Sequence, residues 1–284
     1  IAINGIHIYE ANNYVAGLLG STDSGEIRNI IGEDIHIKTI GNNVGGIIGI
    51  KNTKIIDQLE SIRISNSEIE GNSNVGGIIG QGYIRTTASI DNCQIKGKTY
   101  VGGAMGVSNY LDGGIYDINV SNSDITGEVS VGGIIGNGGN IYESKITKSN
   151  VEGFTTDSMN VGGIVGTANW AIKTSKVLDC NIISKGNNVG STSGNGLKSE
   201  FNVSLNNYIE GYANVGGISG QGIGGTIQYN YTNSIVVATE HSAGGLVGYL
   251  DNSTMNNMNN LSSIYSNYYA GGTIQSKTNV GGII

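Results

Sequence analysis

Apolar positions along this chain occur in short runs that are separated by glycine and asparagine. The clearest run, Asn43 to Gly49 (NVGGIIG), returns almost unchanged at Asn74 to Gly80. The chain lacks the periodicity of an amphipathic helix, whereas β-branched residues between Gly and Asn are typical of short strands joined by tight turns. The pattern therefore predicts an all-β protein.

The phrase belongs to an internal repeat. Its first position recurs ten times, at intervals of 26–31 residues and a last interval of 37. These first positions are Val15, Val44, Val75, Val101, Val131, Val161, Val189, Val215, Ala243 and Val280. Each unit offers about three short extended segments. The repeat therefore predicts an all-β parallel β-helix (β-solenoid) of about ten coils, with about three short strands per coil, in a single β-solenoid domain over residues 1–284.

Other repeat architectures fit the period or the composition less well. A propeller blade needs roughly 40 to 50 residues and four strands. The calcium-binding nonapeptide repeat is missing, because Asp does not follow the glycines in this chain. Helical and leucine-rich repeats require a helical segment that the pattern does not show.

In a stacked coil, each position of the phrase becomes a column along the solenoid. The first position is Val in nine copies and the fourth is mostly aliphatic, so both are expected to face the core. Because strand side chains alternate between two faces, this requires the glycine pair to bend the chain by adopting angles that other residues avoid, while it packs tightly near the axis. Under strict alternation the fourth column would instead be an exposed aliphatic stripe suited to docking. The fifth position admits Ser193 and Ser219, so partial burial is expected there.

A second phrase precedes most copies, and its columns explain the two cysteines. Cys93 and Cys180 stand where other copies have serine, as at Ser67 and Ser123. We expect them to be small buried residues in one column. They are about three coils apart, roughly 14 Å at the usual strand spacing, so no disulfide is expected between them.

Two polar features of the second phrase are interpreted as structural. Asn66, Asn92 and Asn122 are expected to stack as an amide ladder at a corner. Glu70 and Lys96 are expected to pair on the outer face.

Composition and charge argue against several classes of function. The chain has 48 Gly and no Pro, and its net charge is -7 without a basic cluster. Binding of nucleic acid by phosphate neutralisation is therefore not expected. No apolar run approaches the roughly 20 residues of a membrane span. The glycine phrase also lacks the lysine and the following helix of a phosphate-binding loop. We expect no nucleic-acid partner, no membrane insertion and no cofactor.

Three histidines are candidates for catalysis or metal binding. His7 and His36 each lie between isoleucines and are expected to point outward, and His241 follows Glu240 in a turn. None has the spacing of zinc ligands. The chain also lacks the dense Asp, Lys and Arg patch of β-helix enzymes that cleave acidic polysaccharides. No catalytic, cofactor-binding or metal-binding residue is predicted, and the chain itself is not expected to be an enzyme.

Tyrosines are enriched in the C-terminal third of the chain. Exposed Tyr beside Asn suits contact with carbohydrate or protein, although the strand propensity of Tyr explains the enrichment equally well. The candidate surface contacts are Tyr208, Tyr212, Tyr229, Tyr231, Tyr265, Tyr268 and Tyr269.

Gly17 to Gly20 (GLLG), Gly245 to Gly248 (GLVG) and related copies resemble the GLUG repeat of bacterial surface proteins. The resemblance covers nearly the whole chain, with Ile replacing Leu in most copies and a decayed copy at Val189 to Gly194. The repeat occurs in secreted or wall-anchored proteins, including immunoglobulin A1 peptidase-like zinc metallopeptidases and adhesin-like proteins. It implies a β-helical region accessory to other domains, outside the cell or on its surface. The peptidase zinc motif is absent from this chain, so the resemblance implies no catalytic residue.

The chain starts in a strand-like run and stops inside a copy of the phrase, at Val280 to Ile284. Because solenoids end in polar caps, we expect a fragment of a longer chain whose neighbouring domains are its partners. The leading hypothesis is a non-catalytic extracellular spacer, scaffold or adhesive surface that contacts a host protein or glycan. The alternative is a polysaccharide-processing enzyme. A cleft with three or more acidic or basic side chains would favour the enzyme, and a smooth face of Asn, Ser and Gly ladders would favour the scaffold.

Overall fold

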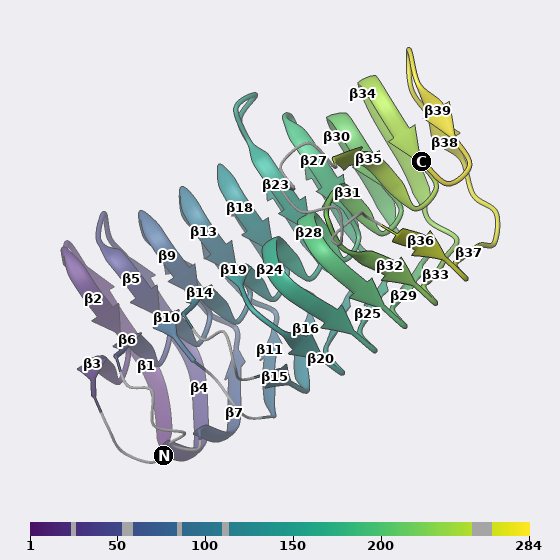
Figure 1. The fold of residues 1–284 in the computed structure, drawn as a ribbon. Helices are drawn as coiled ribbons and strands as arrows, with labels where there is room; N and C mark the ends of the chain where they lie inside the picture. The colour runs from purple at the N-terminus through teal and green to yellow at the C-terminus, as the bar shows by residue number, and fades with distance from the viewer. Residues whose placement is uncertain (24–26, 53–58, 84–86, 110–113, 252–262) are drawn as a thin grey trace.

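The computed structural model describes residues 1–23, 27–52, 59–83, 87–109, 114–251 and 263–284 (Figure 1). In these residues all regular structure is β-strand, and strands of successive turns pair in parallel. They form an elongated parallel β-solenoid with the N-terminus at one end and the C-terminus at the other (Figure 1). The predicted all-β solenoid is confirmed.

Strands in equivalent positions of successive turns form stacks along the axis. The first stack contains β7 (Leu59–Ser65), β11 (Ala88–Asp91), β16 (Ile118–Ser121), β21 (Lys145–Thr147), β25 (Lys176–Leu178), β29 (Val203–Leu205), β33 (Tyr231–Thr232) and β37 (Tyr268–Tyr269). The second contains β8 (Glu68–Glu70), β12 (Gln94–Lys96), β17 (Asp124–Gly127), β22 (Asn150–Gly153), β26 (Asn181–Ser184) and β38 (Ile274–Gln275). The third contains β2 (Asn13–Ala16), β5 (Asn42–Gly45), β9 (Ser73–Gly76), β13 (Thr99–Gly102), β18 (Val129–Gly132), β23 (Met159–Gly162), β27 (Asn187–Gly190) and β39 (Val280–Gly281).

Two further stacks and a few long strands complete the turns. The fourth stack contains β3 (Leu19–Thr22), β6 (Ile48–Lys51), β10 (Ile79–Gly82), β14 (Met105–Ser108), β19 (Ile135–Gly138), β31 (Ser219–Ile223) and β35 (Val247–Asp251). The fifth contains the short strands β15 (Ile115–Tyr116), β20 (Ile141–Tyr142), β32 (Thr226–Gln228) and β36 (Ser263–Tyr265). Six long strands each belong to two neighbouring stacks: β1 (Ala2–Tyr9), β4 (Ile27–Lys38), β24 (Val165–Lys173), β28 (Ser193–Glu200), β30 (Tyr208–Gly216) and β34 (Ile235–Gly244).

The number of turns can be counted along the third stack, because each of its strands carries the first position of one copy of the phrase. From Val15 in β2 to Ala243 in β34 it encloses eight turns, so the solenoid has about eight turns rather than ten coils. Ten copies of the phrase enclose only nine intervals. The last interval contains residues 252–262, which lie outside the described residues. A typical turn crosses four or five stacks, more than the three strands expected, because the phrase forms two strands.

The phrase spans a corner of the solenoid. β5 ends at Gly45 and β6 begins at Ile48, so Gly46 and Ile47 lie at the bend. Val44 and Ile47 are both fully buried, which confirms that the first and fourth positions face the core. The fourth column is therefore not an exposed stripe.

Close packing, and not an unusual backbone angle, requires glycine at this bend. Gly45 and Gly46 are not among the glycines with positive φ. A Cβ atom on Gly45 would lie 2.0 Å from the Ile48 carbonyl oxygen, and one on Gly46 would lie 2.3 Å from the Gly77 carbonyl oxygen in the next turn. The expectation of special glycine angles was wrong, whereas the expectation of tight packing is confirmed.

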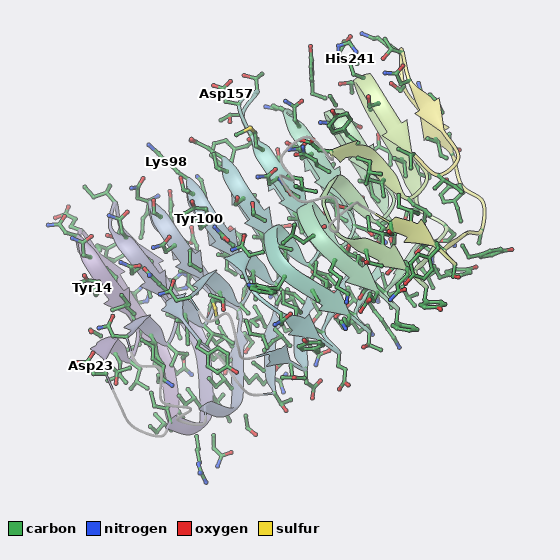
Figure 2. All side chains as sticks on the ribbon, in the orientation of Figure 1. Tyr14, Asp23, Lys98, Tyr100, Asp157 and His241 are labelled. Atoms are coloured by element: carbon green, nitrogen blue, oxygen red, sulfur yellow. The ribbon has the colours of Figure 1, made fainter. Side chains whose placement is uncertain are left out.

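The left-handed backbone angle falls on the residue before the valine. φ is 54° in Asn43, 54° in Asn74 and 63° in Asn160. Asparagine tolerates this region better than most residues. Tyr14 and Tyr100, which are labelled in Figure 2, have φ of 55° and 56°.

The fifth position of the phrase is fully buried, so the expected partial burial was wrong. Ser193 and Ser219 are each 1% exposed, and Ile135 at the same position is 0% exposed. The two serine hydroxyls lie 3.1 Å apart in adjacent turns. Serine is tolerated in the core here because its hydroxyl finds a hydrogen-bond partner.

The serine and cysteine column is confirmed by its hydrogen bonds. The Cys93 amide donates to Ser123 Oγ at 3.1 Å. The Cys93 Sγ contacts the Asp91 carbonyl at 3.3 Å, just as Ser123 Oγ donates to the Ser121 carbonyl at 2.7 Å. Cys93 and Cys180 are both free and buried, and burial raises the pKa of each thiol to about 11.

The asparagine ladder at the next corner is confirmed only in part. Asn92 Nδ2 donates to Asn66 Oδ1 at 2.8 Å, but Asn122 Nδ2 donates to Asp91 Oδ1 at 2.8 Å. The bonds from Ser121 and Asn122 hold the pKa of the Asp91 carboxyl below its ordinary value. A carboxylate accepts two amide or hydroxyl bonds at once, so Asp91 outcompetes the neighbouring asparagine.

The core changes in character along the axis. From the first turns to the sixth, the inward columns are almost entirely Ile and Val. Around β27 to β33, many buried positions are Ser, Thr and Asn, although Val189, Ile209 and Val215 stay in the core. The polar ones are Thr192, Ser193, Ser199, Asn202, Ser204, Asn207, Ser219, Asn230, Thr232 and Ser234. We call these two regions the aliphatic turns and the polar turns.

Candidate functional site

The structure brings five of the seven candidate tyrosines to one corner of the solenoid. This corner joins the fifth stack to the first and carries Tyr229, Tyr231, Tyr265, Tyr268 and Tyr269. Tyr208 and Tyr212 lie apart from them, in β30. The candidate set is therefore a partial cluster.

Aromatic rings at this corner stack along the solenoid axis. Phe201 stacks on Tyr229 with ring centroids 4.8 Å apart, and Tyr231 stacks on Tyr268 at 5.4 Å. Tyr265 meets Tyr229 edge to face at 6.0 Å. We call these five residues the aromatic edge. Phe201 was missed because a regional count of tyrosines does not show which corner position each residue occupies.

The stacking decides which part of each ring faces solvent. Rings in adjacent turns cover one another's faces, so their outer rims and hydroxyls are what a partner would meet. Tyr268 is the most exposed member of the edge, at 62%. The aromatic edge therefore suits edge contacts and hydrogen bonds better than stacking of a flat ligand on an open ring face.

A buried ion cluster lies beside the aromatic edge. The Glu200 carboxylate is 2.6 Å from Lys173 Nζ and 3.1 Å from Lys198 Nζ, and Gln228 also donates to it. Burial alone raises the pKa of the Glu200 carboxyl, but these hydrogen bonds outweigh burial and leave the pKa below its ordinary value. The bond to Glu200 raises the pKa of Lys173. The cluster links adjacent turns around the buried carboxylate, while both lysines stay partly exposed.

The remaining candidate tyrosines are tied to neighbouring side chains and backbone. The Tyr208 hydroxyl donates to the Glu210 carboxylate, and this bond raises the pKa of Tyr208. The Tyr269 hydroxyl donates to the Ser234 carbonyl at 3.1 Å, and burial raises its pKa. Tyr212 meets His241 edge to face at 6.1 Å.

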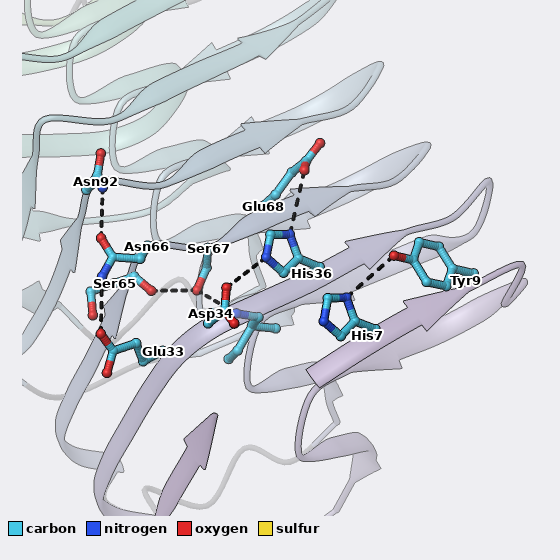
Figure 3. A network of polar contacts seen from close by, with 11 residues as sticks. His7, Tyr9, Glu33, Asp34, His36, Ser65, Asn66, Ser67, Glu68 and Asn92 are labelled. Atoms are coloured by element: carbon cyan, nitrogen blue, oxygen red, sulfur yellow. Dashed lines mark hydrogen bonds and ion pairs between the residues drawn. The ribbon is translucent and has the colours of Figure 1, made fainter. Parts of the chain in front are cut away.

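His7 and His36 point outward as predicted, but they are not isolated. Their rings stack at 5.0 Å with planes 3° apart. His36 Nε2 lies 2.9 Å from Asp34, and its Nδ1 lies 3.7 Å from Glu68 (Figure 3). The pair belongs to a ladder that joins the first turns.

A groove follows the outer face of the second stack through five successive strands, β8, β12, β17, β22 and β26. It has a volume of about 430 Å³. We call it the polar groove, and its polar and half-exposed lining is Glu68, Gln94, Lys96, Asp124, Thr126, Asn150, Glu152, Asn181 and Ile183. Ile95 and Val151 lie beneath it and are fully buried. At roughly 4.8 Å per turn, the five strands span roughly 19 Å.

Some polar groups of the groove already have partners. Asn150 Nδ2 donates to Asp124 Oδ1 at 2.7 Å, and Asn181 Nδ2 donates to Asn150 Oδ1 at 2.9 Å. Lys96 Nζ lies 3.6 Å from Glu70, which confirms the predicted pair. The groove therefore contains an amide ladder, and its one lysine, Lys96, is drawn toward Glu70 at the edge of the groove.

Four charged side chains, Glu68, Lys96, Asp124 and Glu152, line this one groove. Sequence reasoning did not identify it, because its members are not repeated residues of the phrase. A cleft lined by three or more charged side chains was expected to favour a polysaccharide-processing enzyme. The polar groove meets this criterion. The Asn and Ser ladders elsewhere favour the scaffold.

Within the described ranges, no three His, Cys, Asp or Glu side chains are grouped so that they could hold a metal ion. In the same part of the chain, no helix has the length and hydropathy that crossing a bilayer requires. No known protein family and no curated protein matches this chain. The resemblance to the GLUG repeat therefore stays a prediction.

Proposed function

We propose that this chain is a non-catalytic β-solenoid that acts as a spacer or scaffold, with an adhesive outer surface, in a larger extracellular protein. The observation that carries the proposal is the in-register stacking of its turns. The third stack pairs strand by strand from β2 to β39, and side-chain ladders join the same turns. A solenoid of near-equivalent turns provides length and a repeated surface.

The spacer role is tested by removing one whole turn. Deleting residues 131–160 joins Ser130 to Val161 and keeps every stack in register. The variant should fold with the same far-ultraviolet circular dichroism and be shorter by roughly 4.8 Å in small-angle scattering. A matched deletion of residues 131–145 removes half a turn and should abolish folding. Equal behaviour of both deletions would contradict the role.

The resemblance to GLUG repeats supports a bacterial surface or secreted location, beside other domains such as a metallopeptidase. Neighbouring domains, a host protein or a host glycan are the partners that this role requires. Treatment of intact source cells with an external protease should remove the chain while a cytoplasmic marker survives. Protection of the chain until the cells are lysed would contradict the location.

A second candidate function is a polysaccharide-processing enzyme, and the charged lining of the polar groove favours it. Asp124 and Glu152 lie on adjacent strands and could serve as an acid and base pair. The test incubates the chain with neutral and acidic polysaccharides and measures new reducing ends. Turnover that Asp124→Asn and Glu152→Gln abolish would establish the enzyme and reject the non-catalytic proposal.

A further inference from the structure

Hydrogen-bonding groups without partners gather in the middle of the polar groove. Among the described residues, the side chains of Gln94, Thr126 and Glu152 make no hydrogen bond or ion pair. Elsewhere on the same face, polar side chains pair with one another, as Tyr208 does with Glu210. The groove is therefore a place on this face where three such side chains lie close together and are left for a ligand.

The charge of the groove limits which classes of ligand it can bind. Three carboxylates and one ammonium line it, and the ammonium of Lys96 is drawn toward Glu70 at its side. Polyanions such as acidic polysaccharides or nucleic acid would be repelled by Asp124 and Glu152. Apart from the half-exposed Ile183, the rest of the outer lining is amide and hydroxyl, which binds uncharged hydroxyl groups well.

The backbone beneath the groove excludes the usual way of binding an extended peptide. Strands β12, β17 and β22 are paired on both sides, so the groove offers no free strand edge for a peptide to join. Ile95 and Val151 are fully buried, so the floor offers no apolar socket for an anchoring side chain. Recognition here must come from side chains, mainly by hydrogen bonds, with Ile183 as the half-exposed apolar contact.

We propose that the polar groove binds an uncharged, linear glycan laid along the solenoid axis. Gln94, Thr126 and Glu152 bind its hydroxyl groups, and the Asp124, Asn150 and Asn181 ladder continues the contact toward Tyr208, the next residue of that column. Because outward positions recur at every turn, each successive sugar meets side chains from the next strand of the stack. The inference deepens the adhesive part of the proposed function and rests on it.

Calorimetric titration of the whole chain with a neutral hexose hexasaccharide tests the inference. An oligogalacturonide of equal length and hexalysine are the charged probes. The neutral glycan should bind, and Gln94→Ala with Glu152→Gln should weaken it by about tenfold or more, since bonds to charged groups are the stronger ones. Gln275→Ala, which removes an exposed amide of the same face near the C-terminal end, should leave affinity unchanged.

Each other outcome identifies what failed. Binding only of the oligogalacturonide or only of hexalysine would overturn the inference, as would neutral glycan binding that the double variant retains. Absence of neutral glycan binding would also overturn it, while the spacer role would stand on its deletion test. Binding followed by shortening of the hexasaccharide would keep the groove assignment and reject the non-catalytic proposal.

Discussion

The aliphatic turns and the polar turns share one backbone but fill it differently. At the fourth position of the phrase Ile164 is followed by Thr192, and at the fifth position Val165 is followed by Ser193, with strand register preserved. The polar substitution divides the apolar core, so that Ile218 belongs to a second cluster. The comparison teaches that these columns accept a smaller polar side chain where its hydrogen bond is satisfied, and do not require hydrophobicity alone.

Asparagine continues the corner columns that serine and cysteine occupy in earlier turns, and it bonds to several backbone groups at once. Asn202 Oδ1 accepts from the Ser175 amide at 2.9 Å, and its Nδ2 donates to the Ile172 carbonyl at 2.9 Å. Asn207 does the same for Cys180 and Val177. The polar turns are therefore held by connected networks, whose loss should be felt over more than one turn.

The largest effect is expected from breaking such a network. Asn202→Leu keeps the volume but removes the acceptor of the Ser175 amide and the donor to the Ile172 carbonyl, and each buried group left unpaired costs about 1–3 kcal/mol. Chemical denaturation should show a loss of about 2–6 kcal/mol. Asn169→Leu, at an exposed asparagine in β24 without a left-handed backbone, is the control and should change stability far less. A loss below about 1 kcal/mol for Asn202→Leu would contradict the network account.

A second pair of variants compares the two kinds of core directly. Ile134→Ala in the aliphatic turns should cost about 2–5 kcal/mol through lost burial and a cavity. Thr192→Val at the same column position should change stability by less than about 1 kcal/mol. The Ile218 carbonyl keeps its bond from the Thr192 amide at 2.8 Å when the hydroxyl is lost. A reversed order of the two effects would overturn the comparison.

Acid should weaken the polar turns through Glu200. Its folded pKa is lowered, so its stabilising contribution is present above the unfolded carboxyl pKa of about 4.3 and is lost as pH falls through the folded value. The melting temperature should fall more between pH 7 and pH 3 in the natural chain than in Glu200→Gln. Glu152→Gln, at a half-exposed carboxylate without a partner among the described residues, should keep the acid sensitivity. Equal slopes for the natural chain and Glu200→Gln would refute this origin.

The smallest effect is expected at the column shared by serine and cysteine. Cys93→Ser restores the commoner residue, which can donate to the Asp91 carbonyl as Ser123 does to Ser121. Stability should change by less than about 1 kcal/mol. Cys93→Val, which cannot make this bond, is the comparison and should be the less stable of the two by denaturant midpoint.

The fold was predictable because residues at the same position of each repeat form one column of the solenoid, so each residue can be compared with its equivalents. Val44, Ile47 and Cys93 were placed correctly from their equivalents in other turns. The bend at the glycine pair was expected, but the second strand of the phrase was missed, because glycine alone does not show whether the chain only bulges or turns a full corner. The burial of Ser193 was missed for a similar reason, since its partner is in the next turn.

The candidate surfaces were harder to predict than the fold. The polar groove depends on side chains that differ from turn to turn, such as Gln94 and Glu152, and a consensus reading removes those differences. The aromatic edge depends on the corner position of each ring. Its members are separated in the sequence, and the strand register between adjacent turns brings Phe201 and Tyr229 into contact.

The two buried thiols offer a way to time local opening of the solenoid. A thiol reacts as its thiolate, so Cys93 and Cys180 can be labelled only when their turn opens to solvent. Cys93 lies within the aliphatic turns, and the Cys180 amide bonds to Asn207, where the polar turns begin. The labelling rates of the two thiols in one sample therefore report how often the solenoid opens locally at two positions along its axis. Each thiol serves as the internal standard for the other.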